Sequence, residues 1–100
     1  MHARVSTYQG TSDSIAGSLA QLDEVVPVVR SMDGSRGIIF LADRDSGKSL
    51  SITLWDTIEA LQASEEAANR LREDSAASAG DTIVGVDRYE VAAFDVAGGA

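Results

Sequence analysis

The side chains with the clearest chemical potential in this sequence are aromatic residues and arginines on strand-like segments. Trp55 is the only tryptophan, and Tyr8 and Tyr89 are the only tyrosines. An indole or phenol ring can stack on a flat ligand, and a phenol hydroxyl can bind or protonate one of its oxygens. Arg4 and Arg88 lie on the same two strand patterns as the tyrosines. An arginine facing a pocket would stabilise a developing enolate or phenolate.

Each of these residues also has an ordinary structural role. Trp55 could pack a helix onto a sheet, with its indole N–H bound to a backbone acceptor. Tyr8 and Tyr89 could be half-buried with their hydroxyls in water, and an arginine on a strand is more often solvated or ion-paired. The residues we assign to substrate binding are Trp55, Tyr8, Tyr89 and Arg88, and no catalytic residue is assigned.

The sequence offers little for metal or cofactor chemistry. It has no cysteine, which excludes disulfides, thiolate catalysis and cysteine-based metal sites. The only histidine, His2, lies at the N-terminus, a poor place for a catalytic base or a metal ligand. The acidic pairs Asp43/Asp45 and Glu65/Glu66 are typical of solvated charge, and the Asp-Ser-Gly-Lys-Ser stretch lacks the spacing of a phosphate-binding loop. We therefore expect no metal and no cofactor.

The charge balance limits the partners. Sixteen acidic residues against eight basic ones give a formal charge of −8, and the basic residues are scattered. Nucleic acids and anionic membranes are therefore not expected as partners, because both attract clustered Lys and Arg. No apolar run approaches the ~20 residues of a membrane helix, and the N-terminus shows no apolar signal segment. We expect a cytoplasmic protein.

The periodicity of apolar residues predicts six elements in one domain. The strands are expected at 3–9, 37–43, 48–55 and 82–94, with one helix from the Thr-Ser-Asp cluster at 11–13 to about Ser31 and another from 56 to about 79. Pro27 should kink the first helix, and Ser64 could break the second. Gly85 suggests a bulge in the last strand. The domain is expected to span residues 1–96, with a mobile tail at 97–100.

This order predicts a ferredoxin-like βαββαβ fold of the α+β class. Its four-stranded antiparallel sheet carries both helices on one face and leaves the other face open. The run at 38–41 is apolar on both faces, so an isolated subunit would expose some of these side chains to water. Pairing two open faces would bury them, which predicts a two-fold symmetric homodimer.

One segment resembles a known family. The stretch Ile-Thr-Leu-Trp-Asp-Thr-Ile-Glu-Ala-Leu-Gln-Ala-Ser at 52–64 resembles the W-[DE]-[ST]-x-E-A-L-x-A-S segment of antibiotic biosynthesis monooxygenase-like proteins, and the stretches at 45–48 and 86–91 are also similar. The resemblance implies a dimeric α+β barrel with a pocket between sheet and helices. It also implies oxidation of a small aromatic or polyketide-like compound by molecular oxygen, without metal or organic cofactor.

In the haem-degrading proteins that share this fold, the resemblance implies that an Asn, a Trp and a His surround the haem iron. Trp55 fits the tryptophan position, but the only asparagine is Asn69 and the second predicted helix has no histidine. Haem ligation is therefore not supported. Two functions stay open: a cofactor-independent monooxygenase, favoured by the resemblance, and a non-catalytic dimeric module that binds a small ligand or serves in a stress response, favoured by the lack of an evident acid–base set.

Overall fold

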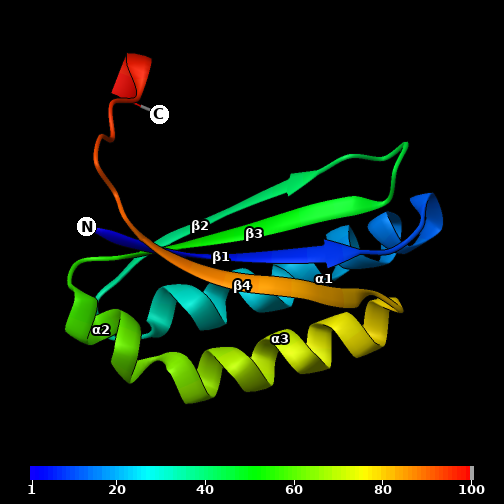
Figure 1. Ribbon diagram of the computed structural model, residues 1–100, viewed down its shortest axis with the longest axis horizontal. Coiled ribbons are helices and arrows are strands. Elements are labelled where there is room, and N and C mark those ends of the chain that lie inside the picture. The colour runs from blue at the N-terminus through cyan, green and yellow to red at the C-terminus, as the bar shows by residue number, and fades with distance from the viewer. Residues whose placement is uncertain (100) are drawn as a thin grey trace.

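The chain folds into four strands and three α-helices in a computed structural model that describes residues 1–99 (Figure 1). The elements follow one another as β1 (His2–Gln9), α1 (Ser12–Ser31), β2 (Ser35–Ala42), β3 (Lys48–Trp55), α2 (Ile58–Ala63), α3 (Glu65–Ala79), β4 (Thr82–Glu90) and a 3-10 turn, η1 (Ala97–Gly99). All four expected strands and both expected helical regions are present.

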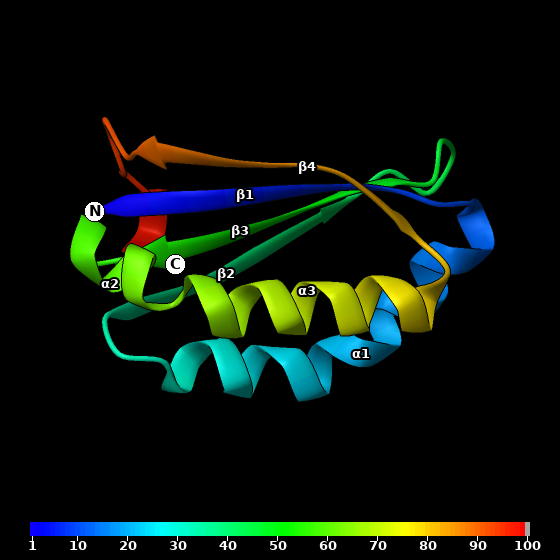
Figure 2. The same cartoon turned by 60° about the horizontal axis from the view of Figure 1, so that its bottom comes forward.

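The four strands form one antiparallel sheet in the order β2-β3-β1-β4. Helices α1 and α3 lie side by side against one face of this sheet, as Figure 2 shows. The predicted ferredoxin-like α+β fold is therefore confirmed. The central position of β1, between β3 and β4, places its inward side chains under both helices.

Local capping chemistry fixes the helix boundaries. Thr11 caps α1: its side chain accepts from the amide of Ser14, and the Ser14 hydroxyl accepts from the amide of Thr11. Helix α1 runs through Pro27 to Ser31, the expected end. The second helical region divides at Ser64 into α2 and α3, the break that the sequence suggested, and the cap of α2 is Thr57. Within residues 1–99, no helix is both long and apolar enough to cross a membrane.

The largest differences from the predicted strand boundaries are at the start of β2 and the end of β4, and the start of β1 and the end of β2 differ by one residue. Strand β2 begins at Ser35 instead of residue 37, because the ladder with β3 continues past an irregularity between Ser35 and Gly37, where Arg36 is the extra residue. Strand β4 ends at Glu90, four residues earlier than expected. The reason is its partner: Glu90 lies opposite His2, the first residue of β1, so the ladder has no strand left to pair with. The predicted bulge lies at Val84, between Ile83 and Gly85.

The segment after β4 leaves the sheet and extends away from the helices (Figure 1). The Val91 amide makes a last bond to the Met1 carbonyl at 2.9 Å, and beyond it Phe94 and Val96 are exposed. Residues 97–99 form η1. The mobility expected for the tail 97–100, which includes Ala100 outside the described residues, stays a prediction, as does the domain boundary at residue 96.

In the middle of β3, polar side chains face the helices and apolar side chains face the open side of the sheet, the opposite of the usual arrangement. Its helix-facing side carries Ser49, Ser51 and Thr53, whereas Leu50 and Ile52 point to the open face. In most antiparallel sheets the apolar side chains face the core. Ile39 and Leu41 of β2 continue the apolar side and are 42% and 47% exposed, so the subunit alone buries only one side of the run at 38–41. Three polar side chains of β3 thus face the helices, while the apolar side chains of its middle lie on the outer face of the sheet.

Candidate functional site

A cavity of about 90 Å³ lies between the inner face of the sheet and the helices. The sheet supplies most of its polar lining: Ser6, Tyr8, Ser49, Ser51 and Thr53. The helices supply apolar walls: Leu22, Val25 and Val29 of α1, and Leu71 and Ala76 of α3. Apolar walls with a few convergent polar groups are typical of sites for small organic ligands.

Trp55 forms one wall of the cavity at the end of β3. Its side chain is fully buried, and its indole Nε1–H donates to the Thr53 hydroxyl at 3.0 Å rather than to the expected backbone carbonyl. The Arg4 guanidinium carbon lies 5.5 Å from the centroid of the ring. A cation over an indole face is attracted by the ring quadrupole, so the two side chains hold each other in place.

Arg4 projects from β1 into the cavity and is only 2% exposed. Its Nη2 donates to the Leu61 carbonyl at 2.8 Å and to the Ser64 hydroxyl at 2.9 Å, and it lies 3.1 Å from a Glu65 oxygen. Arg4 therefore binds groups at the α2–α3 break, where the Leu61 carbonyl also accepts from the Ser64 hydroxyl at 2.7 Å. Burial lowers the pKa of Arg4, and the Glu65 carboxylate opposes that shift.

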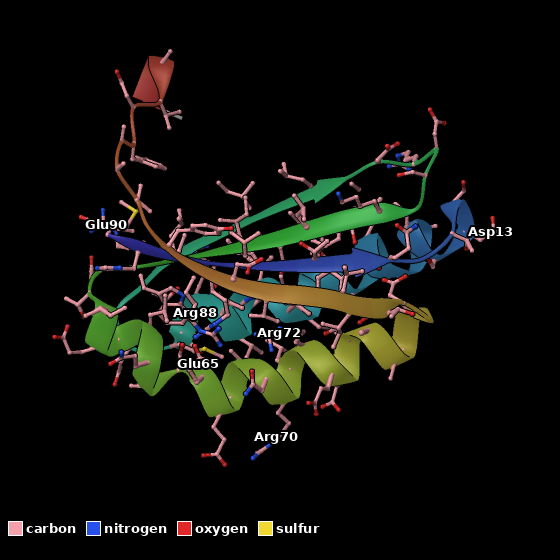
Figure 3. The ribbon with its side chains drawn as sticks, viewed as in Figure 1. Asp13, Glu65, Arg70, Arg72, Arg88 and Glu90 are labelled. Carbon is pink, nitrogen blue, oxygen red and sulfur yellow. The ribbon has the colours of Figure 1, made fainter. Side chains whose placement is uncertain are left out.

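Glu65 joins Arg4 to Arg88 at the edge of the cavity, and Figure 3 shows Glu65 and Arg88 meeting between α3 and β4. Arg88 donates to both carboxylate oxygens, from Nε at 2.5 Å and from Nη2 at 2.7 Å. These bonds, with a smaller contribution from Arg4, lower the pKa of Glu65 to about 2, and they raise the pKa of Arg88. Glu65 is thus a fixed negative charge shared by two arginines.

We expect Glu65→Gln to destabilise the protein at pH 7 by about 1–3 kcal/mol, the range for hydrogen bonds to charged groups. Because the folded pKa of about 2 lies below the ordinary 4.5, the carboxylate stabilises the fold above pH 4.5 and loses this effect as the pH falls toward 2. Urea midpoints at pH 7 and pH 3 should therefore differ less in the variant than in the wild type. The control is Glu66→Gln, whose side chain is 89% exposed. Equal pH dependence in all three proteins would contradict this assignment.

Arg72 is a second arginine of the cavity, and the sequence interpretation did not single it out. It is 9% exposed, with Nε donating to the Ser6 hydroxyl at 3.0 Å and Nη1 to the Asn69 side-chain oxygen at 2.7 Å. The signal that could have found it is periodicity. Arg72 occupies one position of the stripe 68, 71, 72, 75 and 76, whose members all line the cavity.

The structure brings together some of the proposed binding residues and separates others. Trp55 and Tyr8 line the cavity, and the Tyr8 hydroxyl lies 3.3 Å from the Ser51 hydroxyl. Arg88 lies on the inner face but binds Glu65 and is not among the lining residues. Tyr89 lies opposite Ala3 on the outer face and is 56% exposed. Arg4, which the sequence interpretation weighed together with Arg88 but did not assign to binding, lines the cavity beside Trp55.

The donor set of the cavity does not suit a haem iron held by histidine. Its lining residues contain no histidine or cysteine, and His2 lies outside it at the start of β1. Asn69 contacts Arg72 on α3. Within residues 1–99, no three His, Cys, Asp or Glu side chains come together as a potential metal site.

Comparison with solved structures identifies the fold. A putative antibiotic biosynthesis monooxygenase from Deinococcus radiodurans superimposes with a TM-score of 0.74 over 98% of this chain and all of that chain, at 19% identity. The chain has the antibiotic biosynthesis monooxygenase fold. A monooxygenase of Streptomyces coelicolor, in complex with nanaomycin D, covers 95% of this chain and 90% of its own at TM-score 0.68 and 14% identity. The haem degrader MhuD of Mycobacterium tuberculosis, with two haems bound, covers 96% and 99% at TM-score 0.66 and 19% identity.

The relatives found by sequence are described as uncharacterised proteins. The protein Rv2557 of Mycobacterium tuberculosis is 36% identical over 95 residues, which are 94% of this chain and 42% of that protein. The chain therefore spans about two fifths of the length of this relative. No protein-family model matches the sequence. The antibiotic biosynthesis monooxygenase resemblance is thus supported at the level of the fold.

Proposed function

We propose that this protein oxidises a small phenolic compound with molecular oxygen, without metal or organic cofactor. The observation that carries the proposal is the convergence of Trp55, Tyr8 and the buried Arg4 on one cavity. The ring of Trp55 offers a stacking surface, and the Tyr8 hydroxyl offers a hydrogen bond. Two proteins with the same fold are described as monooxygenases, which supports the choice of an oxidation by molecular oxygen.

The chemistry assigned to the residues is the generation of a phenolate. Arg4 and Arg72 place two positive charges in a water-poor cavity, where they favour an ionised phenol more strongly than they would in water. The proton leaves to solvent, and the electron-rich phenolate reduces oxygen. A phenol with a free ring position and one O₂ yield a quinone and one water, because the four electrons lost by the ring are the four that O₂ accepts. No other reductant is required.

The size of the cavity favours a monocyclic substrate. A cavity of about 150 Å³ in another protein binds benzene. At about 90 Å³, this cavity is smaller than that, so a single ring fills it and a fused tricycle could not be enclosed. The proposal is therefore limited to monocyclic phenols and to polyketide-like compounds of similar width.

The active form in this proposal is a homodimer joined through the outer face of the sheet. Leu50, Ile52, Ile39 and Leu41 form an apolar surface there, and no helix of the same subunit covers it within residues 1–99. At ~25 cal/mol per Å², burying a few hundred Å² of such surface stabilises an assembly by several kcal/mol. A cytoplasmic location stays a prediction from the composition.

The alternative is a binding module without catalysis, and one observation favours it. Asp81 is the only acidic residue among those described as lining the cavity, and its Oδ2 accepts a hydrogen bond from the Ser18 hydroxyl. Its Oδ1 has no partner within residues 1–99, but Asp81 lies against Gly10, at the end of β1 remote from Trp55. No carboxylate or imidazole among the described lining residues therefore lies beside Trp55 to remove the phenol proton.

Oxygen consumption distinguishes the two functions. We expect the purified protein to consume oxygen with at least one member of a panel of monocyclic phenols and hydroquinones, at a rate above the buffer and above Arg4→Gln. Product absorbance should rise in a 1:1 ratio with the O₂ consumed from a phenol. Saturable binding without oxygen consumption across the panel would reject the oxidase proposal and leave the binding module.

A further inference from the structure

The guanidinium of Arg4 carries more hydrogen-bond donors than the protein satisfies. An arginine has five N–H donors. The two on Nη2 face Leu61, Ser64 and Glu65. The one on Nε and the two on Nη1 have no partner within residues 1–99, although both atoms are buried. Unsatisfied donors on a buried charged group cost free energy, so they indicate an acceptor supplied from outside the chain.

The charge around these donors is positive. Arg4 and Arg72 both line the cavity, and Arg88 lies at its edge, as Figure 3 shows for Arg72 and Arg88. A single carboxylate, Glu65, is shared between Arg4 and Arg88. This local excess of cations occurs in a chain of formal charge −8. It therefore marks a place where an anion is preferred.

The one acidic residue among the described lining residues, Asp81, is too far away to neutralise Arg4. Asp81 lies against Gly10, six residues after Arg4 on the chain. At the rise per residue of an extended strand, the backbone of Arg4 and that of Gly10 are roughly 20 Å apart. Asp81 is also engaged by Ser18 at 3.0 Å. The cavity thus has a cationic end at Arg4 and a separate polar end at Asp81.

We infer that the cavity takes a monocyclic aryl carboxylate, with the carboxylate at Arg4 and Arg72 and the ring between Trp55 and the apolar helix walls. This deepens the proposed function and rests on it for the reaction, but the binding preference is independent of any turnover. Carboxylate oxygens are the acceptors that guanidinium groups pair with most strongly. The small volume of the cavity limits the ligand to one ring.

The test compares 3-hydroxybenzoate with its methyl ester by isothermal titration calorimetry. The two compounds share the phenol and the ring but differ in the negative charge. We expect the acid to bind the wild-type protein at least 10-fold more tightly than the ester. Arg4→Gln should weaken the acid at least 10-fold and the ester by a much smaller factor, because the ester carries no negative charge. The matched control is Arg70→Gln, which removes the same charge from an exposed site on α3.

Circular dichroism establishes whether each variant is folded, and Arg72→Gln replaces Arg4→Gln if the latter does not fold. Equal affinity for acid and ester, no binding of either, or a preference that persists in the arginine variants would overturn the inference. Oxygen consumption separates it from the proposed function. Tight acid binding without turnover keeps the inference and rejects the oxidase, whereas equal turnover and equal affinity of acid and ester keep the oxidase and reject the inference.

Discussion

Ile52→Asp is expected to convert the proposed dimer into a folded monomer. Ile52 lies at the centre of the outer face of the sheet, opposite Val5 on β1 and Ile39 on β2. In a dimer joined through this face, the substitution would bury an unpaired carboxylate in each subunit, at a cost of several kcal/mol per charge. In a monomer the same carboxylate would be solvated. The dissociation constant should therefore rise by several orders of magnitude.

Light scattering coupled to size exclusion, at micromolar protein, measures this change. Ile52→Val is the matched control, because it keeps an apolar β-branched side chain at the same position. Since Ile52 points away from the cavity, the aspartate variant should keep the far-ultraviolet spectrum of the wild type. A monomeric wild type would reject the dimer, and an unchanged mass for the aspartate variant would place the interface elsewhere.

The sequence was informative wherever structure depends on local chemistry. Thr11 begins a helix because its hydroxyl can accept from an amide of the first turn. Ser64 stands at the break between α2 and α3 as expected, but its hydroxyl donates to the Leu61 carbonyl instead of capping α3. The end of β4 could not be predicted in this way. Its residues after Glu90 have strand-like composition, but the strand stops where its partner β1 begins. The length of a strand therefore depends on where its neighbouring strand begins and ends, and the composition of the strand itself does not reveal this.

The site was predicted in part, and the failure has a geometric origin. Alternation along β1 correctly placed Arg4 and Tyr8 on one face. Which residues of β4 share that face depends on register, which no local pattern reveals. Tyr89 pairs with Ala3 on the outer face, and Arg88 pairs with Arg4 on the inner face. The burial of Arg4 was underestimated because an arginine on a strand is usually solvated, and Glu65, its counter-ion, lies in a distant part of the sequence.

Trp55→Ala is expected to destabilise the protein by about 3–5 kcal/mol, the usual cost of removing a large buried aromatic side chain. Trp55 is fully buried, and its ring packs against the Arg4 guanidinium. Truncation would leave both an enlarged cavity and an arginine without its ring. A chain of 100 residues has a net stability of only about 5–15 kcal/mol, so the loss is a large part of the total. Urea unfolding followed by circular dichroism measures it.

Trp55→Phe separates packing from the polar contact. Phenylalanine keeps an aromatic face for Arg4 but loses the hydrogen bond from the indole N–H to Thr53. The lost hydrogen bond should lower the free energy of unfolding by about 1 kcal/mol, and the smaller ring should lower it further. If the ring stacks on the ligand, Trp55→Phe should weaken binding of 3-hydroxybenzoate a few-fold while the protein stays folded. An alanine variant as stable as the wild type would mean that Trp55 does not form the wall of the cavity. Binding that is unchanged in a folded phenylalanine variant would instead assign the ring to packing alone.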